Sequence, residues 1–357
     1  MTEVFQANGL ATLIGSLPLA DHIEALELIL EFTPEIPIWS QLPVNRREGM
    51  MVQFTPGLPG LCHQNDKLFV NTDGETFDRE LLQFYEDFMA VGEGKIKLDN
   101  SRFALTEDSA RGFFTFLQHM QAHAALAVAV KGQITGPFTF CTGIVDQDRR
   151  ALFYEPQIRD AAVKLLAMKA RFQAERLAEL QRPVIIFFDE PALAGFGSSE
   201  FTSISREEVG QCLEEVFEPV HQVGGLTGVH VCANTDWSLV LDSSADVVSF
   251  DAYGYFDRFI LYPDQIKAFV KAGKILAWGM VPTLNADDLE KETAASLVRQ
   301  FEDKIKQVEA LGIDPHRLIH QSLITPACGT GSLSIDLAQK VLRVTREISQ
   351  EIRKRYP

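Results

Sequence analysis

Three residues of the sequence could together hold a metal ion: His230, Cys232 and Cys328. His230 and Cys232 are two positions apart in an apolar run, and in an extended strand such residues point to the same face. Cys328 follows another apolar run near the end of the chain, and Asp251 follows the run after His230. Two thiolates, an imidazole and a carboxylate form a soft tetrahedral set, so the sequence predicts a zinc site made of these four residues.

The charge of such a site indicates the chemistry that it would support. Zinc with two thiolates, one carboxylate and one neutral imidazole carries a net charge of about −1. A thiol bound there would lose its proton and yet stay electron-rich, which favours attack by its sulfur. The set is poorly suited to making a hydroxide, for which neutral histidine ligands are usual. We therefore expect thiol activation, with a closed zinc site that only stabilises the fold as the alternative.

Other polar residues also end apolar runs and could bind a substrate. Asp189 and Glu190 precede Pro191, and such paired carboxylates could bind an ammonium group or act as an acid and base pair. Capping of a helix is the structural alternative for either carboxylate. Four further residues are predicted to bind substrate at the ends of strands: Ser16, Gln41, Gln133 and Thr135.

Eight short apolar runs that stop at polar or Gly/Pro residues predict buried parallel strands. They span residues 11–16, 36–41, 125–133, 183–190, 226–232, 246–251, 275–282 and 318–326. Capped helical patterns lie between most of them, among them residues 160–180, 205–223 and 287–311. This alternation is typical of the α/β class and of the (β/α)8 TIM barrel, in which groups at the carboxyl ends of the strands carry the chemistry.

The interval between the second and third predicted strands is too long for a simple connection. We expect an insertion between strands 2 and 3, at about residues 54–105, that begins with a small hairpin. Helices are expected at about residues 75–92 and 107–123. No low-complexity or Pro/Ser-rich linker marks a second domain, so one barrel domain over residues 1–357 is predicted.

Composition narrows the classes of partner. The chain has 33 Lys and Arg against 49 Asp and Glu, a net charge of −16, which argues against a nucleic-acid partner. Five cysteines are too few and uneven for a disulfide framework and favour a reducing compartment. No run reaches the ~18 apolar residues of a membrane helix, and the first residues lack a signal-peptide pattern. We expect a cytoplasmic protein without a membrane partner.

Six strings resemble the C-terminal catalytic barrel of the cobalamin-independent methionine synthase family. They are ATLIGSLP, GQITGPFTF, FFDEPAL, HVCAN, DVVSFDA and TPACG, spread over residues 11–329. The wider superfamily includes uroporphyrinogen decarboxylase and the corrinoid-linked thiol methyltransferases. The resemblance implies zinc held by His230, Cys232 and Cys328, with Asp251 standing where the family has glutamate.

The resemblance also implies an activity. A zinc-dependent S-methyltransferase would bind a homocysteine-like thiol, whose amino-acid backbone contacts Ser16 and Asp189, and would methylate it from methyl-folate. Two family features lack a counterpart: the histidine after the seventh strand is missing from WGMVPTLNADD, and WSQLPVNRRE leaves Gln41 or Glu48 in place of a substrate-binding glutamate. A methyl-corrinoid such as methylcobalamin, with a corrinoid protein as partner, is therefore the alternative donor.

Two other functions stay open. A metal-free decarboxylase of the uroporphyrinogen type would need a basic cluster at the barrel mouth, for which the sequence offers only Arg46, Arg47 and Lys131. A non-catalytic zinc- or corrinoid-binding component of a methyl-transfer system would keep the site but show no turnover. Measured activity distinguishes this third hypothesis from an enzyme.

Overall fold

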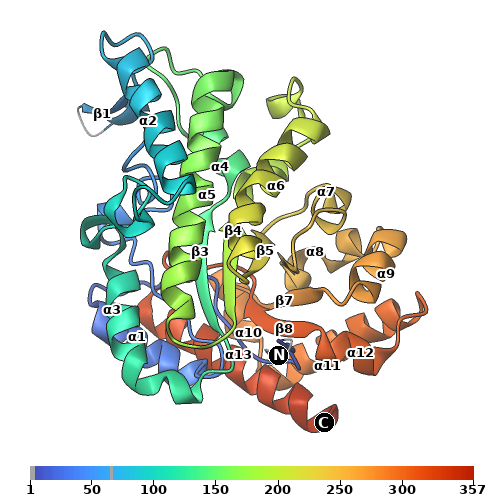
Figure 1. Cartoon of the computed structure of the whole chain (residues 1–357). Coiled ribbons are helices and arrows are strands. Elements are labelled where there is room, and N and C mark those ends of the chain that lie inside the picture. Colours follow the sequence, from blue (N-terminus) through green and yellow to red (C-terminus); the bar gives the residue numbers. More distant parts are fainter. Residues whose placement is uncertain (1–4, 65–66) are drawn as a thin grey trace.

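A six-stranded parallel sheet forms the centre of the computed structural model, which describes residues 5–64 and 67–357 (Figure 1). Almost every residue of these strands is buried, which explains why they read as continuous apolar runs rather than alternating patterns. The strands lie side by side in chain order: β3 (Val130–Thr135), β4 (Val184–Asp189), β5 (Leu226–Val231), β6 (Val247–Phe250), β7 (Ile275–Val281) and β8 (Ser322–Pro326). The expected α/β class with parallel strands is confirmed.

The first two expected strands, residues 11–16 and 36–41, are irregular. They pair through isolated parallel bridges that join Ala11 to Ile324 of β8, Ser16 to Gln41, and Ile38 to Lys131 of β3. The two segments thus connect the outer strands of the sheet, but neither has the continuous ladder of a strand. Pro37 has no N–H to donate, which interrupts pairing in the second segment. The structure shows a parallel sheet of six strands, and its regular closure into an eight-stranded barrel stays a prediction.

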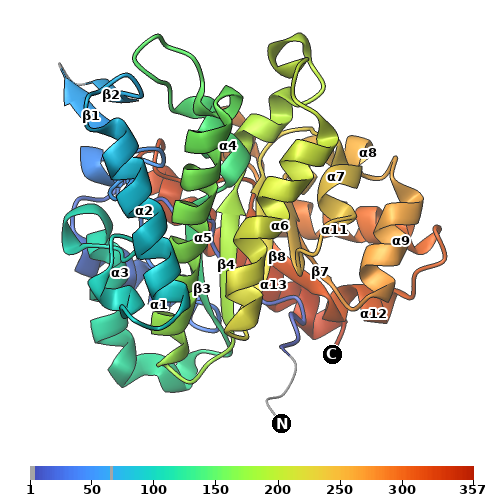
Figure 2. The same ribbon diagram turned by 45° about the horizontal axis from the view of Figure 1, so that its top comes forward.

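Helices cover the outer face of this sheet, as Figures 1 and 2 show. The long helix α5 contacts β3 and β4, α6 contacts β5, and the last helix α13 contacts β7 and β8. No described helix is both long and apolar enough to cross a membrane. In chain order the helices are α1 (His22–Phe32), α2 (Phe77–Gly92), α3 (Glu107–His123), α4 (Pro137–Gly143), α5 (Pro156–Ala178), α6 (Arg206–Gln222), α7 (Trp237–Leu241), α8 (Ala252–Phe259), α9 (Pro263–Lys271), α10 (Ala286–Lys291), α11 (Ala294–Glu309), α12 (Pro315–His320) and α13 (Ile335–Arg355).

The expected insertion contains the predicted hairpin and helices. Strand β1 (Leu61–Gln64) pairs antiparallel with β2 (Lys67–Val70), and residues 65–66 of their connection lie outside the described residues. The hairpin lies beside α2, away from the central sheet (Figure 2). Phe77 and Phe84 of α2 belong to the same hydrophobic cluster as the helices around the sheet. This shared core agrees with the prediction of one domain, which stays a prediction.

Two predicted elements differ from the structure. Residues 318–326 were expected as one strand, but α12 occupies the first part and only β8 is extended. Asp314 accepts from Arg317 N and Pro315 begins the helix, so local capping outweighs the apolar pattern. The single helix expected at 287–311 is two helices, because the Thr293 side chain caps α11 with a new capping box.

The parallel register aligns the polar residues at the carboxyl ends of four strands. Thr135 lies opposite Asp189, Asp189 opposite His230, and His230 opposite Ser249. Side chains at aligned positions of neighbouring strands point to the same face of a sheet. The sheet therefore brings together, at one end, residues that are more than a hundred positions apart in sequence.

A glycine-to-alanine pair tests how closely the helices must approach the second segment. A Cβ at Gly112 of α3 would overlap the carbonyl oxygen of Ser40, whereas a Cβ at Gly210 of α6 would meet no atom within 4 Å. We expect Gly112→Ala to lower the free energy of unfolding by about 1–3 kcal/mol through overpacking. Gly210→Ala should raise it by about 0.5–1 kcal/mol, because alanine favours the helix. Urea unfolding measures both, and equal effects would contradict the proposed packing.

Candidate metal centre

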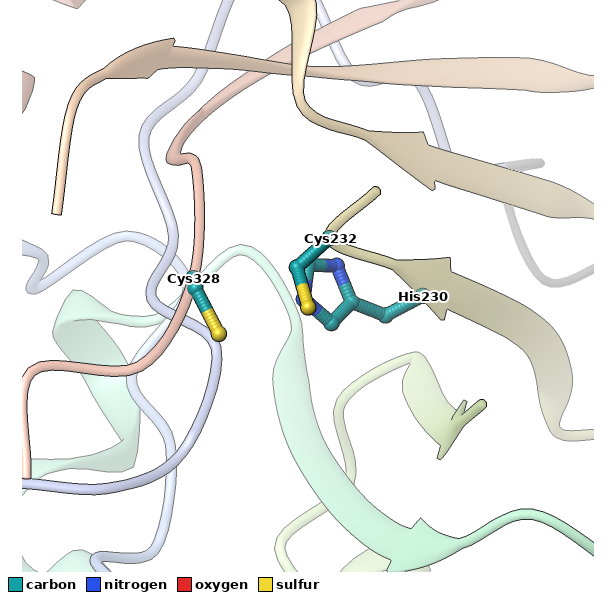
Figure 3. A group of neighbouring side chains, drawn as sticks. All are labelled: His230, Cys232 and Cys328. Carbon is teal, nitrogen blue, oxygen red and sulfur yellow. The ribbon is translucent and has the colours of Figure 1, made fainter. Parts of the chain in front are cut away.

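His230, Cys232 and Cys328 form a cluster at the carboxyl end of the sheet (Figure 3). One ligand atom from each residue lies within 4.8 Å of the others. His230 belongs to β5, and Cys232 is the first residue after this strand. Cys328 comes from the loop after β8. The imidazole is buried and the two thiols are half-buried. The fold thus brings together three of the four predicted ligands.

The ring of His230 is held so that one nitrogen is free. Nδ1 lies 3.0 Å from Ser249 Oγ, while Nε2 is buried and has no hydrogen-bond partner in the described structure. An unpartnered buried nitrogen costs free energy, so its presence calls for a ligand. In the tautomer in which Nδ1–H donates to Ser249 Oγ, the Nε2 lone pair is available to a metal. Metal-binding histidines usually donate from their other ring nitrogen in this way. The residues present therefore fit a metal ion.

The two thiols share a hydrogen bond, and this contact makes them chemically different. The hydrogen bond with Cys328 lowers the pKa of Cys232 to about 4. The same contact raises the pKa of Cys328 well above its ordinary value. Two cysteine sulfurs beside a free imidazole nitrogen form a soft donor set, because each sulfur binds a metal as the thiolate. Such a set suits zinc better than a hard cation such as magnesium.

Asp251 lies outside this cluster. Its Oδ1 accepts from Gly254 N at 2.8 Å, so the carboxylate caps α8. Burial raises the pKa of Asp251 to about 6. The assignment of Asp251 as the fourth ligand stays a prediction, since its carboxylate is not brought among the three ligand atoms.

Asp189 ends β4 next to the cluster and keeps an unused acceptor. The side chain is buried, and its Oδ1 has no hydrogen-bond partner in the described structure. Burial raises the pKa of Asp189 to about 6, opposed by the neighbouring charges of His230 and Lys131. An unpartnered carboxylate oxygen in this position is suited to accept from a donor group of a substrate.

Glu190 makes the hydrogen bonds of a helix cap, and its prediction as a catalytic residue stays a prediction. Its Oε1 accepts from Phe138 N at 2.9 Å, and its Oε2 accepts from Thr139 N at 2.7 Å and Thr139 Oγ1 at 2.6 Å. The carboxylate thus caps the first turn of α4, where backbone N–H groups need acceptors. Burial raises the pKa of Glu190 to about 7, against the effect of these three donors. Both oxygens of Glu190 therefore have partners within the protein.

The predicted substrate residues on β3 differ in availability. Gln133 Nε2 donates to Trp39 O at 2.8 Å, but its buried Oε1 has no partner in the described structure. Thr135 Oγ1 donates to Met50 O at 2.6 Å and fixes the loop after the second segment. Gln133 can therefore accept from a substrate, whereas the Thr135 hydroxyl proton is already used.

Ser16 and Gln41 also have partners within the protein. Ser16 Oγ accepts from Gly331 N at 3.2 Å, in the loop that follows Cys328. Gln41 Nε2 donates to Gln53 Oε1 at 2.6 Å. Ser16 therefore lies beside the loop of a predicted ligand, while Gln41 is linked to Gln53, just before the expected insertion. Their roles in substrate binding stay predictions.

Sequence reasoning missed two residues of the site. Ser249 fixes the His230 ring, and the parallel pairing of β5 with β6 places it directly opposite. A polar residue inside the apolar run DVVSFD was the available signal. Lys131, noted only as a mouth residue, is completely buried, and its Nζ donates to Ile14 O at 2.6 Å.

Three basic residues were named for the mouth of a uroporphyrinogen-type decarboxylase, and the structure places one of them, Lys131, away from any exposed mouth. Lys131 is enclosed in the sheet interior rather than exposed at the mouth. Arg47 is exposed and lies 3.3 Å from Asp108, so its charge is already partly offset. A site that must bind several carboxylates would keep such cations available. The expected cluster therefore loses Lys131, and the decarboxylase alternative stays a prediction.

Comparisons with known proteins give weak likenesses only. No family model matches the sequence, and no curated protein matches it. One similar solved structure is a B12-independent methionine synthase from Shewanella sp. W3-18-1 in complex with selenomethionine. It is 19% identical to this chain, with a TM-score of 0.46, and the alignment covers 67% of each chain. A putative vitamin-B12 independent methionine synthase from Listeria monocytogenes is 11% identical with a TM-score of 0.48, covering 96% of this chain and 97% of that chain.

The neighbouring carboxylates Asp189 and Glu190 provide a matched test of engagement. Glu190→Gln replaces an acceptor of three donors by an amide that directs N–H groups at N–H groups, so the free energy of unfolding should fall by about 1–3 kcal/mol. Asp189→Asn removes an unpartnered buried carboxylate and should cost less than about 1 kcal/mol. Chemical denaturation measures both. A larger loss for Asp189→Asn would show that Asp189 is the structural carboxylate.

Proposed function

We propose that this protein is a zinc-dependent S-methyltransferase that activates a homocysteine-like thiol, as in methionine synthase. The observation that carries the proposal is the buried, unpartnered Nε2 of His230 beside the thiols of Cys232 and Cys328. In the proposed barrel, residues 11–16 and 36–41 serve as the first two of eight strands. The site then lies at the carboxyl ends of the strands, where barrel enzymes have their active sites.

His230, Cys232 and Cys328 would hold the zinc, and Ser249 keeps the His230 ring oriented. Bound zinc would lower the pKa of an acceptor thiol, so that the thiol is ionised at neutral pH. The two cysteine ligands carry negative charge that keeps the acceptor sulfur electron-rich. Asp251, adjacent and buried, is the proposed carboxylate that completes the set or yields its place to the substrate.

Two unpartnered acceptors on neighbouring strands would bind the amino group of the thiol substrate. Asp189 Oδ1 on β4 and Gln133 Oε1 on β3 are both buried and free. An ammonium group has three donors, so it can satisfy both acceptors at once. Hydrogen bonds to an ionised partner are stronger than neutral ones, which favours an amino-acid thiol over a simple thiol.

The proposed reaction is a direct transfer between two bound groups. The acceptor sulfur attacks the methyl carbon in line, and the C–N bond of methyl-folate or the C–Co bond of a methyl-corrinoid breaks. The electron pair of that bond stays with the folate nitrogen, which takes up a proton in place of the one lost by the acceptor thiol, or with the cobalt, which goes from Co(III) to Co(I). The acceptor becomes a thioether. Alignment of sulfur, methyl group and leaving group supplies much of the acceleration. The corrinoid donor would arrive on a partner protein, whereas the folate is a small molecule.

Metal content tests the proposed site directly. We expect wild-type protein purified without added metal to contain about one zinc per chain, and Cys232→Ala and Cys328→Ala to lose it. Cys62→Ala, which removes a half-buried thiol of the β1–β2 hairpin, should keep the metal and serves as the control. Elemental analysis of the four proteins gives the result. Zinc retained in both cluster variants would exclude this site.

Turnover then separates an enzyme from a zinc-stabilised protein. Methylation of homocysteine from 5-methyl-folate or from a methyl-corrinoid is expected to depend on Cys232 and Cys328. Zinc that is bound at the cluster without methyl transfer from either donor would support a structural zinc or a non-catalytic component.

The role of Asp189 predicts a change in substrate selectivity. Asp189→Asn should raise the KM for homocysteine about ten- to a hundredfold, because a charge-assisted hydrogen bond to the ammonium group is lost. The KM for 4-mercaptobutyrate, which has the same length but no amino group, should stay close to the wild-type value. Steady-state kinetics with both thiols measures the effect. An equal rise for both substrates would contradict recognition of the amino group by Asp189.

A further inference from the structure

Lys131 is a fully buried lysine on strand β3 of the central sheet. Its side chain has no exposed surface, and Nζ lies 4.3 Å from the centroid of the Phe187 ring. Lysine is almost never fully buried unless it is paired, because its ammonium group loses hydration. Among the described residues, Nζ donates a hydrogen bond to Ile14 O at 2.6 Å. The proposed reaction assigns Lys131 no task.

Lys131 contacts both irregular segments that join the two edges of the sheet. Its Nζ binds residue 14 of the first segment, and its backbone N–H donates to Pro37 O of the second segment at 3.0 Å. Lys131 also forms the bridge to Ile38. A regular strand is fixed by its ladder of backbone hydrogen bonds, and these segments have only isolated bridges. The side chain of Lys131 thus supplies a constraint that the ladder does not.

The first segment in turn holds the loop that carries Cys328. The carbonyl oxygen of Ser16 accepts from Thr330 N at 2.9 Å and from Thr330 Oγ1 at 3.0 Å, and Ser16 Oγ accepts from Gly331 N. A side chain at Gly329 would overlap Ser16 Oγ, so the contact is close. On its other side the loop is tied to β7 by one bond, from Ala327 N to Val281 O at 2.8 Å.

The cluster therefore has one ligand whose position depends on other segments. His230 is placed by the ladder of β5, which has neighbours on both sides, and Cys232 directly follows Val231, the last residue of that strand. Cys328 lies beyond the end of β8, in a loop held largely by Ser16. A metal site needs its ligand atoms within a few tenths of an ångström of their positions. Whatever fixes the first segment consequently affects the metal centre.

We propose that Lys131 is a positioning residue for the metal centre. Its Nζ fixes Ile14, and the segment from Ile14 to Ser16 holds the Cys328 loop at the correct distance from the two ligands of β5. This inference rests on the metal site of the proposed function, and it gives a buried lysine a role in metal retention.

The test compares two buried lysines. Lys131→Met keeps a side chain of similar length and removes the donor, so we expect zinc to dissociate about tenfold faster or more. Lys169→Met is the matched control: Lys169 on α5 is also buried, donates to a carbonyl oxygen, Ala104 O, at 3.2 Å, and has its pKa lowered to about 7 by burial, as does Lys131. The control should change stability and leave zinc release at the wild-type rate.

Zinc release is measured by transfer to a chromophoric chelator from the zinc-loaded full-length proteins. Cobalt(II) in place of zinc provides a second readout, because its thiolate absorption bands report the geometry of the ligands. The bands of Lys131→Met should shift or weaken, and those of Lys169→Met should match the wild type. Equal release rates and equal spectra for the two variants would overturn the role of Lys131.

A second variant keeps the test decisive where Lys131→Met does not fold. Thr330→Val removes the bond from Thr330 Oγ1 to Ser16 O with almost no change of shape, and should also speed zinc release severalfold. Wild-type release from Thr330→Val would overturn the proposed path. A wild-type protein that takes up no zinc would overturn the metal site itself, whereas zinc-loaded wild type with an unaffected Lys131→Met overturns the positioning role alone.

Discussion

The parallel hydrogen-bond ladder from β3 to β6 is the constraint on which the candidate site depends. It aligns Thr135, Asp189, His230 and Ser249 in one row at the carboxyl ends of four strands. A shift of one residue in any of these pairings would turn the side chains of that strand to the opposite face. The helices packed on the outer face oppose such a shift, because polar side chains would then replace apolar ones in the contact with the helices. Packing and register thus determine the chemistry together.

Buried polar groups in this end of the sheet divide into engaged and free ones. Glu190 caps α4 with both oxygens, and Thr135 is bound to the loop after the second segment. His230 Nε2, Asp189 Oδ1 and Gln133 Oε1 have no partner among the described residues. Free buried polar atoms cost stability, so their concentration at one place indicates a site shaped for ligands rather than for folding alone. Two adjacent carboxylates fall on opposite sides of this division: Asp189 keeps an oxygen without a partner, and both oxygens of Glu190 accept hydrogen bonds.

The N-terminal segments show how side chains can replace a strand ladder. Lys131, from β3, ties the first segment through Ile14, and Ser16 ties the loop of Cys328. Hydrogen bonds of single side chains are individually weak, but they act here on a loop with few other constraints. In the proposed metal centre, the position of Cys328 therefore depends on residues that are distant from it in sequence and that touch no ligand atom.

Local sequence patterns predicted the parallel α/β architecture and the metal-binding candidates His230, Cys232 and Cys328. Apolar runs and caps are local signals, and the HxC spacing with a distant Cys328 needs only strand periodicity. The hydrogen-bond partners of the polar residues depend on the tertiary structure, because they come from other segments: the Glu190 carboxylate, for example, accepts from Phe138 N at the start of α4. The tertiary structure also decided that residues 11–16 are irregular and that Lys131 is enclosed. Partners and burial depend on which segments meet, and local sequence patterns do not contain that information.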